Sequence, residues 1–275
     1  MLEREQIDYL LVNAYNAAVR AGARIMEIYQ SGDLGITLKS DNTPSTLADR
    51  EAHQSIKQYL GQTRIPILSE EGRNLLYEER GTWDLFWMVD PLDGTREFID
   101  HTSHQFTVNI ALMVENEPFL GVIYVPYFDK IYFSDMERGA FVKEGVKPDA
   151  EALFAINEIY QGARQLPLTE ATGSPLRVAV SRMATSPDTD RFVELLRQQG
   201  GEVELVPTGS SLKFCLVAEG SVDYYVRGSL NYEWDTAAGQ AIAAAAGAKT
   251  LDMARGTVLK YNKDNLENPY FYCKK

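Results

Sequence analysis

Cysteine, histidine and long apolar runs are all scarce in this sequence. Only two of the 275 residues are cysteine, and three are histidine. Two cysteines cannot build a disulfide framework for a chain of this length, so we expect a reducing compartment. The longest apolar stretches, Ala241–Ala248 and Phe119–Phe128, fall short of the ~20 residues that a transmembrane helix needs, so we expect no transmembrane segment. We expect His53, His101 and His104 to be helix-surface or loop residues and not metal ligands.

Basic residues are also few. The 27 Lys and Arg residues face 39 Asp and Glu residues, which gives a net charge of −12 and a pI of about 4.8. No Lys/Arg-rich stretch is present, which argues against nucleic acid as a partner. The first ten residues lack the basic flank and apolar block of a signal peptide. We therefore predict a cytoplasmic protein. Peripheral association with the inner membrane stays open, as does the choice between monomer and homodimer.

What the sequence does contain is typical of a globular protein. Hydrophobic residues make up 45% and charged residues 24%, which is enough for a sizeable core. Apolar residues at helical spacing predict a first helix that stops at Ser31-Gly32 and a second from Thr46 to about Leu60. Between the end of the second helix and residue 136 we expect five strands, at 65–68, 85–89, 106–114, 120–124 and 130–134.

The second part of the chain alternates more regularly between strand and helix patterns. We expect strands at 178–181, 203–206 and 222–226, and helices at 188–199, 210–219 and 235–246. Residues 136–174 show the least pattern, and we expect an irregular excursion there. The sequence predicts an α/β protein of two subdomains, residues 1–175 and 176–275, that share a cleft.

One short segment carries the clearest chemical signal. An apolar stretch ends at Asp90, Pro91 forces a turn, Asp93 follows three residues after Asp90, and Gly94 permits a tight bend before Thr95. If residues 95–99 open a helix, its N–H groups would lie beside both carboxylates. Hard divalent cations prefer oxygen ligands, and phosphates prefer helix N-termini. The segment fits a site for magnesium and phosphate, although the same composition also occurs in ordinary turns.

Further acids lie at the expected ends of elements. Glu70 and Glu71 follow a short strand, Asp235 begins an Ala-rich helix, and Asp49 lies on the second helix. Taken singly, each has an ordinary interpretation: Asp235 as a helix N-cap and the others as solvated acids. Together they could converge only if cations offset their repulsion, because an unpaired buried carboxylate costs several kcal/mol. Acid clusters of this kind build the two-metal sites of phosphate-ester hydrolases.

A second anion site is predicted where Gly209, Ser210 and Ser211 precede Lys213. A helix that starts with hydroxyl groups and a lysine suits a phosphate that is held and not cleaved. Simple capping of the helix by Ser210 is the alternative. Arg227, at the end of a strand, would add charge for the same phosphate or stack on a base; its alternative is a surface arginine.

With these motifs in place, the sequence resembles the inositol monophosphatase superfamily of lithium-sensitive, magnesium-dependent phosphatases. Within it, the chain is most similar to the CysQ-type 3′(2′),5′-bisphosphate nucleotidases. Asp-Pro-Leu-Asp-Gly-Thr together with Trp-Asp-x-Ala-Ala-Gly is a highly specific pair of motifs. The matching segments follow the order of the family and span nearly the whole chain; they are 39–49, 68–71, 90–95, 106–111, 209–220 and 234–239.

The resemblance implies a layered α/β/α/β/α sandwich of the inositol monophosphatase/fructose bisphosphatase type and a cofactor of two or three Mg²⁺ ions. The implied metal ligands are Glu70, Asp90, the Leu92 carbonyl, Asp93 and Asp235. The implied catalytic residues are Asp49, Glu70 and Thr95, which would orient a magnesium-activated water. The implied substrate-binding residues are Glu70, Leu92, Asp93, Gly94, Thr95, Gly209, Ser210, Ser211, Lys213, Arg227 and Asp235.

The implied reaction removes the 3′-phosphate of adenosine 3′,5′-bisphosphate, a small phosphate ester, to give AMP and phosphate, and so recycles a by-product of sulfate activation. An inositol or sugar phosphate monoesterase with the same metal site is the first alternative. A non-catalytic sensor of metal and phosphate ligands is the second. A phosphatase that acts on nucleic acid is disfavoured by the acidic composition. Residues 227–233 differ in detail from the usual family approach to Trp-Asp, so recognition of the base stays open.

Overall fold

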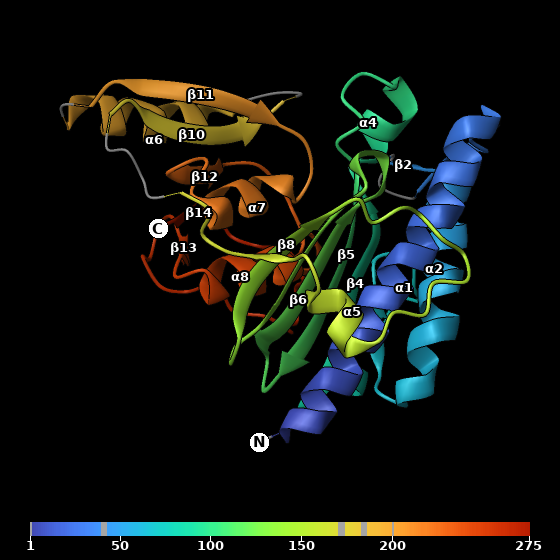
Figure 1. Ribbon diagram of the computed structural model, residues 1–275. Helices are drawn as coiled ribbons and strands as arrows, with labels where there is room; N and C mark the ends of the chain where they lie inside the picture. Colours follow the sequence, from blue (N-terminus) through green and yellow to red (C-terminus); the bar gives the residue numbers. More distant parts are fainter. Residues whose placement is uncertain (1, 40–42, 170–173, 183–185, 200) are drawn as a thin grey trace.

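The computed structural model describes residues 2–39, 43–169, 174–182, 186–199 and 201–275. Two β-sheets alternate with layers of helices in it (Figure 1). Helices α1 (Arg4–Ser31) and α2 (Leu47–Leu60) cover the outer face of the larger sheet. Helices α7 (Leu212–Glu219) and α8 (Ala237–Ala245) lie between the two sheets, and α6 (Pro187–Gln198) covers the far side of the smaller sheet. The predicted α/β/α/β/α sandwich is confirmed.

The long N-terminal helices begin and end where the sequence signals them. Helix α1 is followed by Gly32 in the left-handed conformation, with φ of 75°. Helix α2 is capped by the Thr46 side chain, which accepts from the Ala48 and Asp49 N–H groups, and Gly61 follows it. The shorter helices are α3 (Tyr77–Arg80), α4 (Thr95–Asp100), α5 (Ile156–Tyr160) and the 3₁₀ segments η1 (Gly61–Thr63), η2 (Pro126–Phe128) and η3 (Glu233–Asp235).

The larger sheet has the strand order β3-β4-β5-β6-β7-β8-β9. Strands β3 and β4 are parallel, and the other neighbours are antiparallel. The strands are β3 (Ile67–Ser69), β4 (Leu85–Asp93), β5 (Thr107–Val114), β6 (Glu117–Val125), β7 (Lys130–Asp135), β8 (Gly139–Glu144) and β9 (Arg164–Gln165). A small antiparallel pair, β1 (Thr37–Leu38) and β2 (Pro44–Ser45), lies apart from this sheet. Strands β6 and β7, joined through residues 126–129, pair antiparallel.

The smaller sheet has the order β11-β10-β12-β14-β13. Strand β10 runs parallel to β11 and β12, and β14 runs antiparallel to β12 and β13. The strands are β10 (Leu176–Ser181), β11 (Val203–Thr208), β12 (Tyr224–Arg227), β13 (Lys249–Asp252) and β14 (Phe271–Lys274).

The larger sheet is buried on both faces, so its strands are apolar on both sides. In β5, Val108 and Ile110 pack under α1 and α2, whereas Ala111 and Met113 pack toward α7 and α8. This double burial explains the nearly continuous apolar run of β5.

Residues 136–174 are more regular than the sequence suggested. They contain β8, α5 and β9, which extend the larger sheet. Residues 152–154 then run along α1, where Arg20 Nε donates to the Ala152 carbonyl at 2.8 Å and Asn16 exchanges two hydrogen bonds with Phe154. The expectation of an irregular excursion was therefore wrong for these three elements, because sheet pairing orders β8 and β9. The other described residues of the segment are in neither helix nor strand, as expected, and residues 170–173 lie outside the described residues. Over the described residues, every helix is too short or too polar to cross a membrane.

Candidate active site

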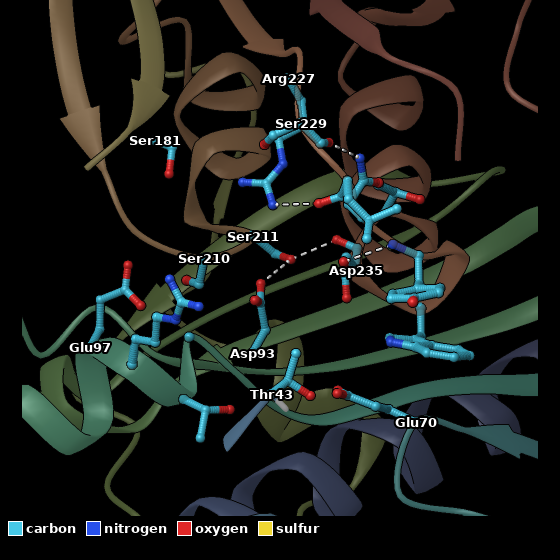
Figure 2. Close-up of a pocket in the computed structure, with 18 of the residues that line it drawn as sticks. Thr43, Glu70, Asp93, Glu97, Ser181, Ser210, Ser211, Arg227, Ser229 and Asp235 are labelled. Atoms are coloured by element: carbon cyan, nitrogen blue, oxygen red, sulfur yellow. Dashed lines mark hydrogen bonds between the residues drawn. The ribbon is translucent and has the colours of Figure 1, made fainter. Parts of the chain in front are cut away.

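A cavity of about 730 Å³ opens where the ends of β3 and β4 meet the loops that follow β11 and β12. Figure 2 shows Glu70, Asp93 and Asp235 along one part of its wall, and Arg227, Ser210 and Ser181 along another, with Glu97 on the same side as Ser181 and Ser210. Most of the predicted site residues line it; they are Glu70, Asp93, Gly94, Thr95, Ser210, Ser211, Lys213, Arg227 and Asp235. Asp49, Asp90, Leu92 and Gly209 are not lining residues and stand behind the wall.

Parallel pairing of β3 and β4 brings two of the acids together. Ser69 lies opposite Val89, and the Glu70 N–H donates to the Val89 carbonyl at 3.1 Å. Glu70 and Asp90 therefore leave neighbouring strands at the same edge. Asp90 is only 1% exposed and accepts a hydrogen bond from the Leu92 N–H at 3.1 Å. A bulge between Asp90 and Asp93 then turns Asp93 toward the cavity.

Asp49 is buried, not exposed as a helix acid usually is. Its side chain accepts from the Thr46 N–H at 2.7 Å and the Thr46 hydroxyl at 2.6 Å, and it is 2% exposed. The other carboxylate oxygen accepts from Thr95 Oγ1 at 3.1 Å. Burial raises the pKa of Asp49 to about 6, although the bonds from Thr46 oppose the shift.

Gly94 begins helix α4 at a backbone conformation that favours glycine, with φ of 90°. A side chain there would also crowd Gln105 and Ser210. The first N–H groups of a helix have no intrahelical partners. The Leu92 carbonyl oxygen also lies at this turn, 3.4 Å from Thr95 Oγ1, and is a more distant alternative acceptor to Asp49 for its one proton.

Ser211 joins acids that come from different parts of the chain. Its Oγ lies 2.8 Å from Asp93 Oδ2 and 2.8 Å from the Asp235 carbonyl, and it accepts from Asn109 Nδ2 at 2.9 Å. Asp235 lies in η3, where its carboxylate accepts from the Tyr232 N–H at 2.9 Å. The Ser211 hydroxyl is therefore engaged with protein groups at the junction of the two sheets.

The predicted second anion site has donors that lack protein partners. Ser210 has a φ of 45°, and its buried Oγ has no hydrogen-bond partner among the described residues, so it does not cap α7. Lys213 is buried, and its Nζ donates to the carbonyls of Thr208 at 3.1 Å and Ser210 at 2.7 Å. Burial, with the nearby Arg227, lowers the pKa of Lys213 to about 8. Arg227 donates from Nη2 to the Leu230 carbonyl at 3.0 Å, while its buried Nε has no hydrogen-bond partner in the described part of the chain.

The acids of the cavity have one basic partner, Lys39, among the described residues. Burial and mutual repulsion hold the pKa values of Asp90, Glu70 and Asp235 above the ordinary range of carboxyl groups. The one cationic group that an ion pair places here among the described residues is Lys39, with Nζ 2.6 Å from Glu70 and 2.5 Å from Glu71. Its contact with two carboxylates marks a position that suits positive charge.

An all-oxygen donor set of this kind fits magnesium chemically. As the side chains stand in the described ranges, no three His, Cys, Asp or Glu groups are arranged to hold an ion. The Lys39 ammonium is paired with carboxylate oxygens of Glu70 and Glu71, and one carboxylate oxygen of Asp90 accepts from the Leu92 N–H.

Sequence reasoning missed several residues at this site. Lys39 lies within a segment that carries the family resemblance, but its pairing with Glu70 has no local signal. Asn109 lies in β5, whose sequence is otherwise typical of a buried strand. Glu97 lies in the first turn of α4, two residues after Thr95. His53 is also buried, contrary to the surface or loop position expected, and its Nδ1 lies 2.9 Å from Ser69 Oγ behind the site.

Comparisons with known proteins identify the family of this chain. The sequence matches the inositol monophosphatase family over residues 6–272. It is 39% identical to the 3′(2′),5′-bisphosphate nucleotidase CysQ of Salmonella typhimurium, with 95% of this chain and 98% of that protein covered. It is 34% identical to the protein of the same name from Haemophilus influenzae, with 96% and 92% covered.

Solved structures show the same likeness. The crystal structure of CysQ from Bacteroides thetaiotaomicron superposes with a TM-score of 0.88 at 40% identity, covering 97% of both chains. The Thermotoga maritima IMPase shares the fold at 22% identity, with a TM-score of 0.72 and coverage of 98% and 92%. On the extent of the family match and the identity to these relatives, the chain belongs to the inositol monophosphatase family.

Proposed function

We propose that this phosphatase hydrolyses the 3′-phosphate of adenosine 3′,5′-bisphosphate to AMP and inorganic phosphate. One observation carries the proposal. A single cavity presents an acid cluster around Thr95 and, across from it, a set of donors with unused hydrogen-bonding capacity at Ser210 and Arg227. A substrate with two phosphates satisfies both sides, since one is cleaved at the acids and the other is held by the donors. The relatives named 3′(2′),5′-bisphosphate nucleotidase support this choice.

Glu70, Asp90, Asp93, Asp235 and the Leu92 carbonyl would hold magnesium. The ions, when bound, supply Lewis-acid activation of water and neutralise charge on the phosphate. The raised pKa values of Glu70, Asp90 and Asp235 support this assignment, because burial and then repulsion between acids raise them, and a divalent cation offsets both effects by favouring the charged carboxylates.

Thr95 and Asp49 orient the attacking water. Because Thr95 Oγ1 donates to Asp49 Oδ1, the lone pairs of Oγ1 are directed away from Asp49 and can accept a proton from water in the cavity. Asp49 then takes the proton that Thr95 passes on, and its pKa of about 6 suits a proton acceptor near neutral pH. The N–H groups of Gly94 and Thr95 at the start of α4 stabilise the phosphate oxygens.

Ser210, Lys213 and Arg227 hold the phosphate that is not cleaved. The Lys213 ammonium supplies positive charge and is held in place by its hydrogen bonds to two backbone carbonyls. Ser210 Oγ and Arg227 Nε have no hydrogen-bond partner among the described residues and can donate to a ligand. The wall beside them carries a stacked pair, Tyr232 and Trp234, with ring centroids 5.0 Å apart. Aromatic surfaces of this type accept purine bases.

Phosphate release is the direct test. We expect magnesium-dependent, lithium-sensitive turnover of adenosine 3′,5′-bisphosphate and far slower turnover of inositol 1-phosphate. Lys213→Ala should raise KM for the bisphosphate more than it changes kcat. Turnover of inositol 1-phosphate alone would refute the nucleotide assignment and leave the metal site standing. Inactivity on both esters with magnesium bound would refute the proposed phosphatase mechanism for these substrates.

A further inference from the structure

Glu97 is an unpaired carboxylate inside the phosphate-binding cavity. It lies in α4, two residues after Thr95, and is only 7% exposed. It lines the cavity, yet across the described part of the chain no hydrogen bond or ion pair engages it. The carboxylate oxygens stay open to the cavity and have no donor among the described residues, so they are available to a donor of the bound ligand.

The surroundings place the Glu97 carboxylate beside the predicted phosphate-holding loop. Glu97 Oε1 would lie 3.2 Å from a Cβ built on Gly209, so glycine leaves room for it. In Figure 2, Glu97 is on the same side of the cavity as Ser181 and Ser210, away from Glu70 and Asp235. The neighbouring Gly209 N–H cannot serve it, because that group donates to Gln105 Oε1 at 2.7 Å.

Four basic residues line the cavity, Lys39, Arg96, Lys213 and Arg227, and among the described residues none of them forms an ion pair with Glu97. Lys213 Nζ donates to two backbone carbonyls, and Arg227 Nη2 donates to the Leu230 carbonyl. Glu97 acts on Lys213 only through space, where its charge favours the ammonium form. A phosphate oxygen close to Glu97 would be repelled. The chemistry left for Glu97 is to accept a hydrogen bond from an uncharged donor of the bound ligand.

We infer that Glu97 is a specificity-determining residue that accepts a hydrogen bond from an uncharged donor on the nucleoside part of the substrate. Two groups of adenosine 3′,5′-bisphosphate have this chemistry: the ribose 2′-hydroxyl and the exocyclic amine of the base. Either contact would orient the nucleoside while the carboxylate repels phosphates placed wrongly. The inference rests on the proposed function and deepens it.

The test pairs substitutions at Glu97 with substrates that lack one donor each. The substrates are adenosine 3′,5′-bisphosphate, its 2′-deoxy analogue and the inosine analogue, which has no exocyclic amine. Because a hydrogen bond to a charged group would be lost, we expect Glu97→Ala to lower kcat/KM for adenosine 3′,5′-bisphosphate about 10- to 100-fold. On the analogue that lacks the contacted donor, wild type and Glu97→Ala should differ by less than about threefold. The other analogue should behave like the parent, which identifies the donor.

Two further variants separate this role from folding and from charge. Glu97→Gln keeps a carbonyl acceptor, so its loss on the parent should be smaller than that of Glu97→Ala. Asp100→Asn removes an exposed charge from the same helix and should leave all three substrates unchanged. Melting temperatures confirm that the variants are folded.

Equal losses for Glu97→Ala on all three substrates would overturn the inference, because a purely structural role predicts that result. A gain on all three would also overturn it, because the carboxylate would then only repel phosphate. Failure of the proposed function is a different result, since wild type would then not turn over adenosine 3′,5′-bisphosphate at all.

Discussion

At the residue scale, burial gives ordinary side chains the properties that this site needs. Asp49 would be a routine helix acid if it were exposed, but buried against Thr46 and Thr95 it has a pKa of about 6. Lys213 would be a surface ammonium, but buried beside Arg227 it has a pKa of about 8. Each shift costs stability and yields a group near its titration point, which is a common property of functional sites.

The first prediction concerns Asp49 and Thr95 as one unit. Asp49→Asn and Thr95→Ala should each lower kcat about 100-fold or more, because loss of a positioned proton acceptor costs roughly 10²–10⁴. The double variant should be no slower than the slower single variant, since both changes break the same Thr95–Asp49 bond. Steady-state kinetics measures this, with magnesium affinity by calorimetry expected to stay unchanged. Glu51→Gln, an exposed change on α2, is the control. Losses that multiply in the double variant would contradict the proposed unit.

The second prediction is a pH dependence set by Lys213. The pKa of Lys213 is about 8, so the free protein loses this charge as pH rises through 8. The 5′-phosphate of AMP is already fully ionised above its second pKa of about 6, so its own charge is constant there. Affinity for AMP at fixed magnesium should therefore fall as pH rises from 7 to 9.5, measured by calorimetry. Lys213→Met should bind weakly at every pH and show no such step. A step of equal size in the variant would assign it to another group.

The same pKa shift predicts the effect on stability. The pKa of Lys213 in the folded protein lies below its ordinary value of 10.5, so folding favours the neutral amine. The stability that this provides is present above pH 10.5 and is lost as pH falls through 8. At pH 7 the buried charge of Lys213 destabilises the folded protein, so Lys213→Met should raise the free energy of unfolding by on the order of 1–3 kcal/mol. Denaturant unfolding at pH 7 and pH 10 measures the difference, which should shrink at the higher pH.

At the scale of elements, the packing of α8 on β6 positions the last acid of the site. Helix α8 follows Asp235 directly and crosses the larger sheet at Gly121. A Cβ at Gly121 would come 2.4 Å from the Ala238 carbonyl, which is backbone and cannot rotate away. The absence of a side chain at Gly121 therefore sets how closely α8 approaches the sheet.

The third prediction tests this contact with two glycines. Gly121→Ala should lower the free energy of unfolding by about 1–3 kcal/mol, because α8 must move to relieve the overlap. Because Asp235 precedes α8, magnesium affinity should weaken as well. Gly61→Ala is the matched control: Gly61 has a φ of −56° and open space where the Cβ would lie. It should be neutral or slightly stabilising. Denaturant unfolding and calorimetry measure both variants, and equal stability for the two would refute the argument.

The elements that the sequence predicted well are those whose signals are local. In helices α1 and α2, the apolar spacing lies within each helix and the glycine that ends it follows directly, at Gly32 and Gly61. Strands β13 and β14 were missed because Phe271–Lys274 pairs with Tyr224–Arg227 and Lys249–Asp252, which are distant in the sequence. Strand β8 was missed for the same reason, since its order comes from β7 and β9.

The same distinction applies to the site. The acids at the end of β4 could be predicted from turn chemistry and from the family motif. The burial of Asp49, the Lys39 ion pair and the unpaired state of Glu97 could not, because each depends on which element packs against it. Whether a given acid is solvated, paired or held ready for a ligand is decided by tertiary packing, and a single sequence does not reveal that.

At the scale of the whole molecule, the site joins the two sheets, and the acids that it brings together repel one another. Asp90 belongs to the larger sheet, and Asp235 enters from the chain that links the smaller sheet to α8. Burial and repulsion from Glu70, Asp93 and Asp235 raise the pKa of Asp90 well above its usual range. Bringing the two halves together therefore costs free energy that a bound cation would offset.

The last prediction follows from that balance. Asp90→Asn replaces a carboxyl group whose ionisation is opposed by burial and by the neighbouring acids, and the amide can still donate to Glu70 in place of the carboxyl proton. In EDTA, its melting temperature should exceed that of wild type by about 3 °C or more, since ~1 kcal/mol shifts a protein of this size by about 2–4 °C. Added magnesium should raise the melting temperature of wild type and leave Asp90→Asn nearly unchanged, because a ligand that binds only the folded state stabilises it. Asp84→Asn, an exposed change just before the same strand, should behave like wild type in both conditions. If Asp90→Asn instead melts lower in EDTA and still responds fully to magnesium, Asp90 is a structural acid and the cation site lies elsewhere in the cavity.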